Sequence, residues 1–466
     1  MTLWLHWWNA ISLLRPAFSR LRSFLWFVTA VAGLTVRPEL LGVTSIVRAL
    51  CLKPVFYDRL LDHFHSASVK PDVLAALWTR LVLKLFPAPV RINGRLVLVG
   101  DGIKAAKRGK KMPGVKMLHQ QSESNKAEYI MGHSLQAICL LVQAAETVFA
   151  VPLAMRIHEG IVWSNRDQRT LLDKMLALLG VVSIAEAFYF VGDAYYASGK
   201  IINGLLEQNN HLVTRARSNA VAYRQFVPRQ GPKRRGRPQI YGKKISLKTL
   251  FRDKAELQEM PSPVYGETNV KLQYQVRDLL WRPARRLVRF VAVIHPSRGR
   301  ILLMCTDLTL SAADIIRLYG LRFKIEHTFK QAVNQIGTLA YHFWMQKMKP
   351  LRRRNGNQYM HREELDYRTL VKRKLNAYHV FIQAGLIAQG LLQYLAAVLP
   401  QLVWDSFGSW LRTIRAGIPP SELVVATALR QRLPQFLLDN SGGNIFSKFI
   451  LDRQDTDKIQ LFRTAA

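Results

Sequence analysis

The segment from Thr306 to Gln331 (TDLTLSAADIIRLYGLRFKIEHTFKQ) constrains the fold more than any other part of this sequence. Ser311 and Asp314 form the S-x-x-D pattern that caps a helix, so we expect a helix from Ala312 to about Gln335. At about 100° per residue, four functional side chains of this helix share an arc of roughly 80°. They are Tyr319, Arg322, Glu326 and Lys330. A lone glutamate on such a face is usually a solvated partner of a cation, so a functional role for Glu326 requires that other acids converge on it.

Two aspartates follow short apolar runs that have the composition of buried strands. The run at 95–99 (RLVLV) leads into Gly-Asp-Gly and Asp101, and the run at 185–191 (AEAFYFV) leads into Gly-Asp-Ala and Asp193. The ordinary alternative for each is a turn aspartate that hydrogen-bonds its own backbone. In open α/β sheets, however, ligands bind beyond the carboxyl ends of the strands. Both aspartates are therefore candidates for chemistry.

The order of the expected elements predicts the fold class. Alternating and apolar runs predict strands at 95–99, 129–143, 147–157, 185–191 and 211–215, with helices at 167–179 and 198–208. Three strands, a helix, a strand, a helix and a strand is the order of an RNase H-like α/β domain. Strands at 287–294 and 301–305 then lead back to the helix that carries Glu326. We expect an α/β fold with an RNase H-like catalytic domain, a β-rich insertion, and helical regions on both sides in sequence.

The expected division of the chain has five parts. Residues 1–90 form a helical DNA-binding domain, for which an ordinary helical packing domain is the alternative. Residues 91–215 and 287–345 form the two parts of the catalytic domain. Residues 216–286 form a basic, β-rich insertion, for which a disordered basic loop is the alternative, and residues 346–466 form a basic linker and a helical C-terminal region.

The net charge of +36 and the pI near 10.5 favour a polyanionic partner, and nucleic acid is the main candidate. A basic protein of membrane surfaces is the alternative. The apolar runs at 24–34 and 378–400 are interpreted as buried helices rather than as a signal sequence and a membrane span. Three scattered cysteines indicate a reducing compartment, and we expect a cytoplasmic protein that is not bound to a membrane.

Clustered cations indicate where phosphates bind. One cluster follows Asp101 directly, and the members expected to contact DNA are Lys104, Lys107, Arg108, Lys110 and Lys111. A second lies in the insertion, at Arg234, Arg235 and Arg237. The alternative for both is a solvated charged face. The first cluster would repel itself unless an anion bound there.

Asp101, Asp193 and Glu326 together suit two-metal phosphoryl transfer. That chemistry needs hard carboxylate oxygens around two ions held about 3.5–4 Å apart. We therefore expect two Mg²⁺ ions, with Mn²⁺ as a substitute, bound by these three residues. Three carboxylates crowded together without a cation would repel each other.

These motifs resemble those of a known family. The sequences GDG at 100–102, GDAYYASGK at 192–200 and LYGLRFKIEHTFK at 318–330 are similar to signatures of the DDE transposases of bacterial insertion sequences, of the cut-and-paste type with a β-strand insertion. The Y-x-x-R-x-x-x-E spacing is the most specific part. The resemblance implies that Tyr319 and Arg322 grip the transposon-end DNA. The family's lysine seven residues after the glutamate is Val333 here, and Lys330 is the substitute.

The resemblance also implies an aromatic residue that holds a flipped base, for which Trp281 is the candidate and an ordinary core tryptophan the alternative. It implies a homodimeric synaptic complex on double-stranded transposon ends and target DNA, in the bacterial nucleoid. The expected function is a DNA transposase that binds terminal inverted repeats and cleaves and transfers strands. A stand-alone RNase H-like nuclease or resolvase and a non-catalytic basic DNA-binding protein are the alternatives.

Overall fold

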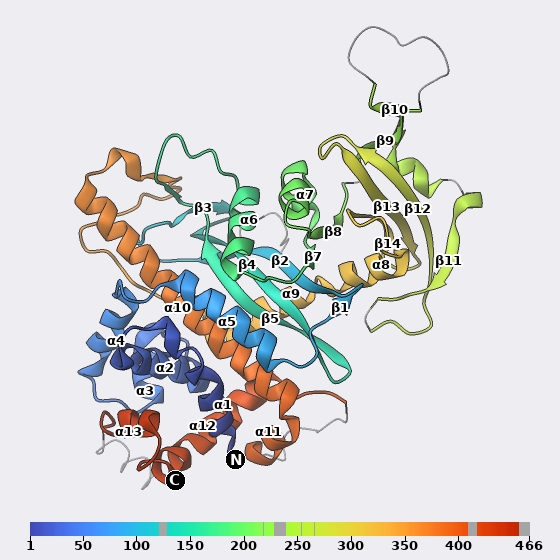
Figure 1. Cartoon of the computed structure of the whole chain (residues 1–466). Coiled ribbons are helices and arrows are strands. Elements are labelled where there is room, and N and C mark those ends of the chain that lie inside the picture. Colours follow the sequence, from blue (N-terminus) through green and yellow to red (C-terminus); the bar gives the residue numbers. More distant parts are fainter. Residues whose placement is uncertain are drawn as a thin grey trace. The chain divides into compact units, whose positions relative to one another are not determined.

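The computed structural model describes residues 1–120, 128–217, 219–227, 239–252, 254–264, 266–408 and 417–455. The chain forms two compact units, each assembled from separate segments (Figure 1). Unit 1 contains Met1–Pro89, Gly102–Ile184 and Glu326–Ala466. Unit 2 contains Val90–Asp101 and Ala185–Ile325. The five-part division remains a prediction about roles, because these units are defined by compactness alone.

Unit 2 is built on a mixed sheet in the order β10-β9-β12-β13-β14-β8-β7-β2, with β1 beside β2 and β11 beside β12. The pairs β2–β7 and β7–β8 are parallel, whereas the other pairs are antiparallel. The bounds are β1 Arg91–Ile92, β2 Arg95–Ala106, β7 Phe188–Val191, β8 His211–Arg215, β9 Val221–Gln225, β10 Tyr241–Ser246, β11 Gln258–Pro261, β12 Lys271–Trp281, β13 Arg286–His295 and β14 Gly299–Cys305. Strand β2 continues into unit 1 beyond Asp101.

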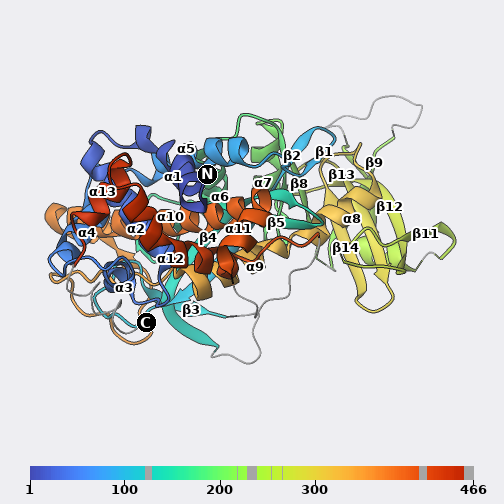
Figure 2. The same ribbon diagram turned by 90° about the horizontal axis from the view of Figure 1, so that it is seen from below.

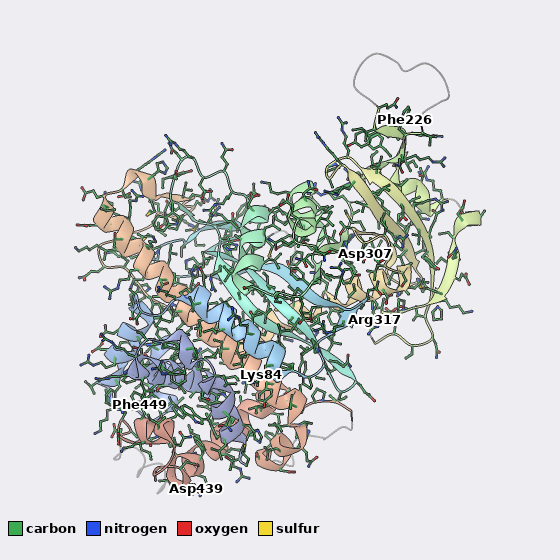
Figure 3. All side chains as sticks on the ribbon, in the orientation of Figure 1. Lys84, Phe226, Asp307, Arg317, Asp439 and Phe449 are labelled. Atoms are coloured by element: carbon green, nitrogen blue, oxygen red, sulfur yellow. The ribbon has the colours of Figure 1, made fainter. Side chains whose placement is uncertain are left out.

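The parallel strands of unit 2 are apolar throughout because they are buried on both faces. Every residue of β7 is buried, and so are Leu96 to Val99 of β2. Short helices complete the unit: η2 Ala194–Tyr196, α7 Gly199–Leu206, η3 Leu247–Phe251, η4 Lys254–Glu256 and α8 Ala312–Leu321. Asp307, labelled in Figure 3, is buried between strand and helix, where the Tyr189 hydroxyl donates to its Oδ2 at 2.6 Å.

Unit 1 combines helices with an antiparallel ladder of β3, β4 and β5. Its N-terminal segment is helical, as predicted: α1 Leu3–Ser12, η1 Arg15–Ala17, α2 Leu21–Val36, α3 Gly42–Ala49, α4 Phe56–His65 and α5 Pro71–Leu85. Then come β3 Lys116–His119, β4 Tyr129–Ala144, β5 Thr147–Ile157, β6 Ile161–Val162 and α6 Leu171–Val182. The C-terminal segment contains β15 Gln358–Tyr359, η6 Met360–Arg362, α10 Leu365–Val398, α11 Pro400–Phe407, α12 Glu422–Asp439 and α13 Ile445–Leu451.

Helix α10 is the central helix of unit 1. It packs against β5, α2, α4, α5 and α12, and Figures 1 and 2 show it running among these elements. Within the described residues it alone is long and apolar enough to cross a membrane by length and composition, and 89% of its apolar window is buried. Its glutamines are also used internally, since Gln383 Nε2 donates to Leu153 O at 2.9 Å. Such burial is typical of a core helix.

The prediction of one continuous helix from Ala312 to about Gln335 is wrong, because the helix is interrupted. The structure has α8 Ala312–Leu321, a turn at 322–323, α9 Lys324–Gln331 and a π-helix, η5 Ala332–Ile336. At the turn, Arg322 N donates to Tyr319 O and Ile325 N donates to Arg322 O, which is three-residue rather than four-residue spacing. The Ser311 cap predicted the start correctly, since Ser311 Oγ accepts from Asp314 N. The common arc calculated for a straight helix therefore does not apply past Arg322.

Candidate functional site

Three neighbouring strands of unit 2 place charged side chains at the same level of the sheet. Asp101 lies inside β2, so the expected end of that strand at Gly-Asp-Gly is wrong, whereas Asp193 follows β7 and Arg215 ends β8. Val99 pairs with Val191, and Val191 pairs with Val213, in two successive parallel ladders. Asp101, Asp193 and Arg215 each follow two residues after one of these valines. Neighbouring strands lie about 4.8 Å apart, so the two aspartates and the arginine are adjacent across β2, β7 and β8. The sequence indicated both aspartates as candidate site residues, but it did not predict that the valines before them pair across neighbouring strands.

Asp193 is held by the backbone around it. Its Oδ1 accepts from Tyr195 N at 3.0 Å, so the carboxylate caps η2, and its carbonyl accepts from Thr214 Oγ1 at 2.6 Å. Gly192 N donates to Val213 O at 3.2 Å, which keeps β7 against β8 up to the aspartate. The turn that was the ordinary explanation for Asp193 is therefore present. It fixes the direction of the Asp193 carboxylate just after β7.

Arg322 brings helix α8 into this group. Its Nη1 donates to Asp101 Oδ2 at 2.8 Å, and both side chains are about one-fifth exposed. Burial raises the pKa of Tyr319, the charges of Arg322 and Arg215 oppose the rise, and the charge of Asp193 adds to it. Tyr319, Arg322, Arg215 and the two aspartates thus form one electrostatically coupled cluster, which we call the strand-end cluster.

Glu326 lies in the first turn of α9 and belongs to unit 1. Its side chain is exposed, and the helix behind it is anchored. Thr328 Oγ1 donates to Ala150 O of β5 at 2.6 Å, and Gln389 Nε2 of α10 donates to Thr328 O at 3.0 Å. Lys330, four residues after Glu326, is also exposed. The presence of a π-helix directly after α9 is notable because such segments are frequent at functional sites.

The strand-end cluster contains donors of the kind that divalent metals prefer. Asp101 and Asp193 supply hard carboxylate oxygens, which suit Mg²⁺. One of these carboxylates already has a cation, because the Arg322 guanidinium lies on Asp101. Across the described ranges, no three or more histidine, cysteine, aspartate or glutamate side chains gather closely enough to hold a metal ion. The two aspartates of unit 2 therefore fit part of a metal site.

Comparison with known proteins identifies the family. Residues 101–342, about half of the chain, match the family described as the transposase DDE domain. The chain belongs to this family of DDE transposases. The match begins at Asp101 and includes Asp193 and Glu326. DDE transposases generally use divalent metal ions.

Other comparisons add little to that assignment. No curated protein sequence matches the chain. One similar solved structure is described as a cryo-EM structure of piggyBac transposase in a synaptic complex with hairpin DNA. It has 10% sequence identity and a TM-score of 0.36, and the alignment covers 84% of this chain and 73% of that one. A likeness at that level carries no argument about this transposase.

The basic loop after Asp101 contains one cation that does not face solvent. Lys107 is 5% exposed, its Nζ donates to the carbonyls of Leu339 and Tyr341, and it lies 3.5 Å from the centroid of the Tyr341 ring. Burial lowers the pKa of Lys107 to about 7. The expectation that Lys107 contacts phosphate is corrected accordingly. The cause is strand alternation, because Ala105 and Lys107 are buried whereas Lys104, Ala106 and Arg108 are exposed.

The other predicted DNA contacts divide into three groups. Lys104, Arg108 and Lys110 are exposed and Lys111 is half-buried, so they remain candidates. Trp281, at the end of β12, is 7% exposed, so the structure places it in the core, which was the alternative explanation, and not at a surface where a base could stack. Arg234, Arg235 and Arg237 lie outside the described residues.

Sequence reasoning missed Arg215, and it did not give the exposure of Trp344. Arg215 ends the strand HLVTR, so its position at a strand end was a usable signal. Trp344 is 64% exposed in the segment between η5 and α10, where the sequence shows only an aromatic residue among mixed neighbours. Nothing in that local pattern distinguishes an exposed tryptophan from a core one.

Proposed function

We propose that this transposase binds the terminal inverted repeats of an insertion sequence and catalyses metal-dependent cleavage and transfer of DNA strands. The observation that carries the proposal is the strand-end cluster, in which Asp101, Asp193 and Arg215 each lie two residues beyond a paired valine of adjacent parallel strands and Arg322 donates to Asp101. Paired carboxylates suit metal ions, and neighbouring arginines suit the phosphates on which such ions act. An RNase H-like core with an inserted β-rich segment is part of the same proposal.

Asp101, Asp193 and Glu326 are proposed to hold two Mg²⁺ ions, for which Mn²⁺ can substitute. When bound, such ions polarise the attacking water or 3′-hydroxyl and stabilise the leaving oxygen. Glu326 is assigned to this set by its place four residues after Arg322 in the Y-x-x-R-x-x-x-E motif. The other residues of the proposed site contact DNA or orient these carboxylates.

Arg322 is proposed to orient Asp101 and to contact end phosphates together with Tyr319 and Lys330. The pairing of Arg322 with Asp101 supports the first role, because a guanidinium that donates to one carboxylate oxygen fixes the direction of the other. A guanidinium has five N–H groups, so one arginine can serve both a carboxylate and a phosphate. Lys104, Arg108, Lys110 and Lys111 would extend the phosphate contacts along the loop after β2.

The charge of the whole chain supports DNA as the partner. A net charge of +36 destabilises a compact protein unless a polyanion neutralises it. We propose that residues 1–90 contact the inverted repeats and that two copies of the chain hold two transposon ends in one synaptic complex. We further propose that the element is bacterial and that the protein acts at the nucleoid.

Cleavage of a labelled end duplex with Mg²⁺ tests this function. Glu326→Gln should reduce cleavage by at least about a hundredfold, because loss of even an outer partner of a bound metal costs about 10- to 100-fold. Duplex binding should be retained. Glu363→Gln, at an exposed glutamate elsewhere in unit 1, is the control and should cleave normally. Equal cleavage by wild type and Glu326→Gln would refute the assignment of Glu326.

Strand joining separates the transposase from a stand-alone nuclease. The cleaved 3′ ends should be joined to a target duplex in the same reaction. A protein that cleaves but never joins would support the nuclease alternative instead.

A further inference from the structure

Arg37 is a buried cation of the N-terminal segment that the proposed chemistry does not use. It lies between α2 and α3 and is 1% exposed. Burial lowers the pKa of its guanidinium to about 10, so the group is still charged at neutral pH. A buried charge is costly unless hydrogen bonds compensate it, so the acceptors around Arg37 show what it is for.

The guanidinium of Arg37 joins two segments that are far apart in the chain. On one side, Nη1 donates to Gly42 O at 2.8 Å and to Ser45 Oγ at 2.9 Å, both in α3. On the other side, Nη2 donates to Ile336 O at 2.6 Å and to Gly337 O at 3.0 Å. All four acceptors are uncharged. Arg37 therefore links the start of α3 to the segment that follows α9.

The carbonyls of Ile336 and Gly337 lie at the end of the helix that carries Glu326. Helix α9 continues directly into η5, which ends at Ile336, and Gly337 follows with a left-handed backbone at φ 67°. The last carbonyls of a helix have no donor within the helix, and they lie at the negative end of its dipole. A cation is favourable there. Arg37 thus holds one end of a helix whose first turn contains Glu326.

The N-terminal side of this contact is closely packed. A Cβ added to Gly33 of α2 would collide with Ile46 Cγ2 of α3, so the two helices are in contact beside Arg37. A Cβ added to Gly42 would lie 3.4 Å from Ala340 O, so α3 also approaches the chain just beyond Gly337. The base on which the guanidinium rests is therefore rigid.

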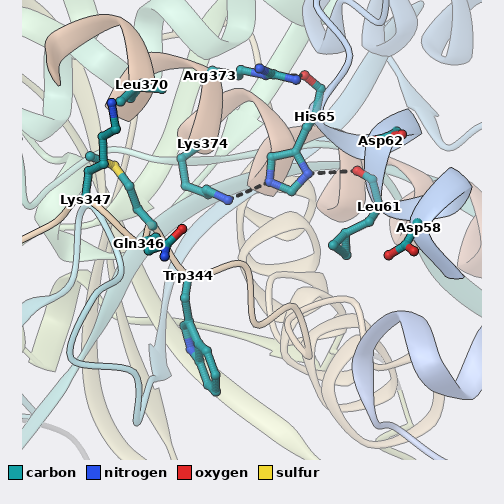
Figure 4. A pocket seen from close by; sticks show the side chains of 11 residues that line it. Asp58, Leu61, Asp62, His65, Trp344, Gln346, Lys347, Leu370, Arg373 and Lys374 are labelled. Atoms are coloured by element: carbon teal, nitrogen blue, oxygen red, sulfur yellow. Dashed lines mark hydrogen bonds between the residues drawn. The ribbon is translucent and has the colours of Figure 1, made fainter. Parts of the chain in front are cut away.

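The chain beyond Gly337 remains fixed within unit 1. The buried ammonium of Lys107 donates to Leu339 O and Tyr341 O, and the ring of Phe343 lies 5.7 Å from that of Phe64 in α4. The next residues, from Trp344 to Lys347, line a pocket with His65 of α4, whose Nε2 accepts from Lys374 Nζ at 2.7 Å (Figure 4). Two buried cations, Arg37 and Lys107, thus hold successive carbonyls after the helix of Glu326.

We propose that Arg37 is a positioning residue, which fixes the C-terminal end of the α9–η5 helix and thereby the direction of Glu326. Roughly 15 Å of helix separates Glu326 from Ile336. Near its start the helix is held at Thr328, by Ala150 O and by Gln389. A second anchor at its end prevents the helix from pivoting about the first.

The inference rests on the proposed function, in which Glu326 is a metal ligand, and it adds a residue that acts through Glu326. Arg37 belongs to the segment 1–90 that is proposed to contact the inverted repeats, but a side chain that is 1% exposed cannot reach DNA. A purely structural role would lower stability without changing metal binding. The two roles can therefore be separated by experiment.

Hydrogen exchange of the protein without metal or DNA tests the anchor itself. Arg37→Gln should speed the exchange of backbone amides at 326–338 at least about tenfold, because hydrogen bonds from a charged group that hold this segment are lost. Arg156→Gln is the control. Arg156 is also a buried arginine of unit 1, but its partners lie in α5, β5 and α10, so exchange at 326–338 should match wild type.

Binding of Mn²⁺, followed by electron paramagnetic resonance, tests the effect on Glu326. Arg37→Gln should weaken Mn²⁺ binding about tenfold, as loss of an outer partner of a metal ligand does. The Mg²⁺ concentration that gives half-maximal cleavage of the end duplex should rise by the same factor, while duplex binding is retained. Arg156→Gln should leave both metal readouts unchanged.

Gly337→Ala disturbs the same contact from the other side, so the test does not depend on the folding of Arg37→Gln. A Cβ added to Gly337 would collide with Arg37 Nη2, and we expect the same changes in exchange and in Mn²⁺ binding. Gly408→Ala is its control. Gly408 has the same left-handed backbone at the end of α11, and a Cβ added there has no neighbour within 4 Å.

Unchanged exchange at 326–338 in Arg37→Gln and Gly337→Ala would overturn the proposal. Faster exchange with unchanged Mn²⁺ binding would make Arg37 a structural residue only, and an equal loss of Mn²⁺ binding in Arg156→Gln would point to general destabilisation; either result would also overturn it. Wild-type protein that cleaves no end duplex would instead refute the proposed function, whatever the exchange at 326–338 shows.

Discussion

Single residues of the strand-end cluster carry opposite charges at close range, and their balance decides what the cluster can bind. Asp101 is paired with Arg322 at 2.8 Å, while Asp193 is held by backbone donors. The pair is only about one-fifth exposed, so it is better shielded from salt than a surface ion pair. We therefore expect a measurable coupling between the two side chains.

A double-mutant cycle of Arg322→Gln and Asp101→Asn should give a coupling free energy of about 1 kcal/mol in urea unfolding. Arg289→Gln with Asp278→Asn is a matched control. That ion pair lies in the same unit, its N–O distance of 2.7 Å is similar, and its side chains are similarly exposed. It should give a coupling of similar size. Additive effects at Arg322 and Asp101, with coupling at the control pair, would show that the ion pair is absent in solution.

Elements of secondary structure determine which residues meet, and here close helix packing depends on small side chains. Gly390 in α10 lies against Trp78 of α5, where an added Cβ would come within 2.3 Å of the indole. Trp78 cannot easily withdraw, because its Nε1 donates to Pro152 O at 2.8 Å. Gly180 in α6 is exposed, and a Cβ there would have no neighbour within 4 Å.

Gly390→Ala should lower the free energy of unfolding by about 1–3 kcal/mol, as overpacking of a core does. Gly180→Ala should raise it by up to about 1 kcal/mol, because alanine favours a helix more than glycine. Urea or thermal unfolding measures both. A Gly390→Ala variant as stable as wild type would mean that α5 and α10 do not pack this closely.

The sequence predicted elements well where a regular pattern governs them. Strands β5 and β8 have the expected bounds, since apolar runs between turn signals define them. The break at Arg322 was not predicted, because the partner that Arg322 reaches, Asp101, is 221 residues away in the chain. The burial of Lys107 was missed for a related reason. A run of cations gives the charge of a loop but not which member points inward.

At the scale of the whole molecule, the net charge influences both which partner the protein binds and how stable its fold is. A net charge of +36 becomes more positive in acid, as carboxylates and exposed histidines take up protons. Unit 1 also contains buried histidines that resist protonation. Burial lowers the pKa of His63 to about 4 and that of His133 to about 3. His133 is neutral, with Nδ1 at 2.7 Å from the Tyr341 hydroxyl and Nε2 at 3.0 Å from Pro113 O.

Stability should therefore fall as the pH falls below about 6.5. The unfolded chain takes up these protons near its ordinary histidine pKa of about 6.5, whereas the folded chain does not until about pH 3–4, so each group favours unfolding in that window. Between pH 7 and pH 5 one such histidine accounts for about 2 kcal/mol. Urea unfolding at several pH values measures the slope, and His133→Gln should reduce it. A slope unchanged by His133→Gln would contradict the assigned burial.

The central claim is that Asp101 in β2 and Asp193 just after β7 form part of one metal site. Affinity cleavage tests it most directly: Fe²⁺ with ascorbate and peroxide generates hydroxyl radicals that cut the backbone beside a bound ion. We predict cuts near residues 101 and 193 that excess Mg²⁺ suppresses, that Asp193→Asn abolishes, and that Asp314→Asn, a control in the first turn of α8, leaves in place. Cuts at neither residue 101 nor residue 193, or the same cuts in Asp193→Asn, would contradict the account.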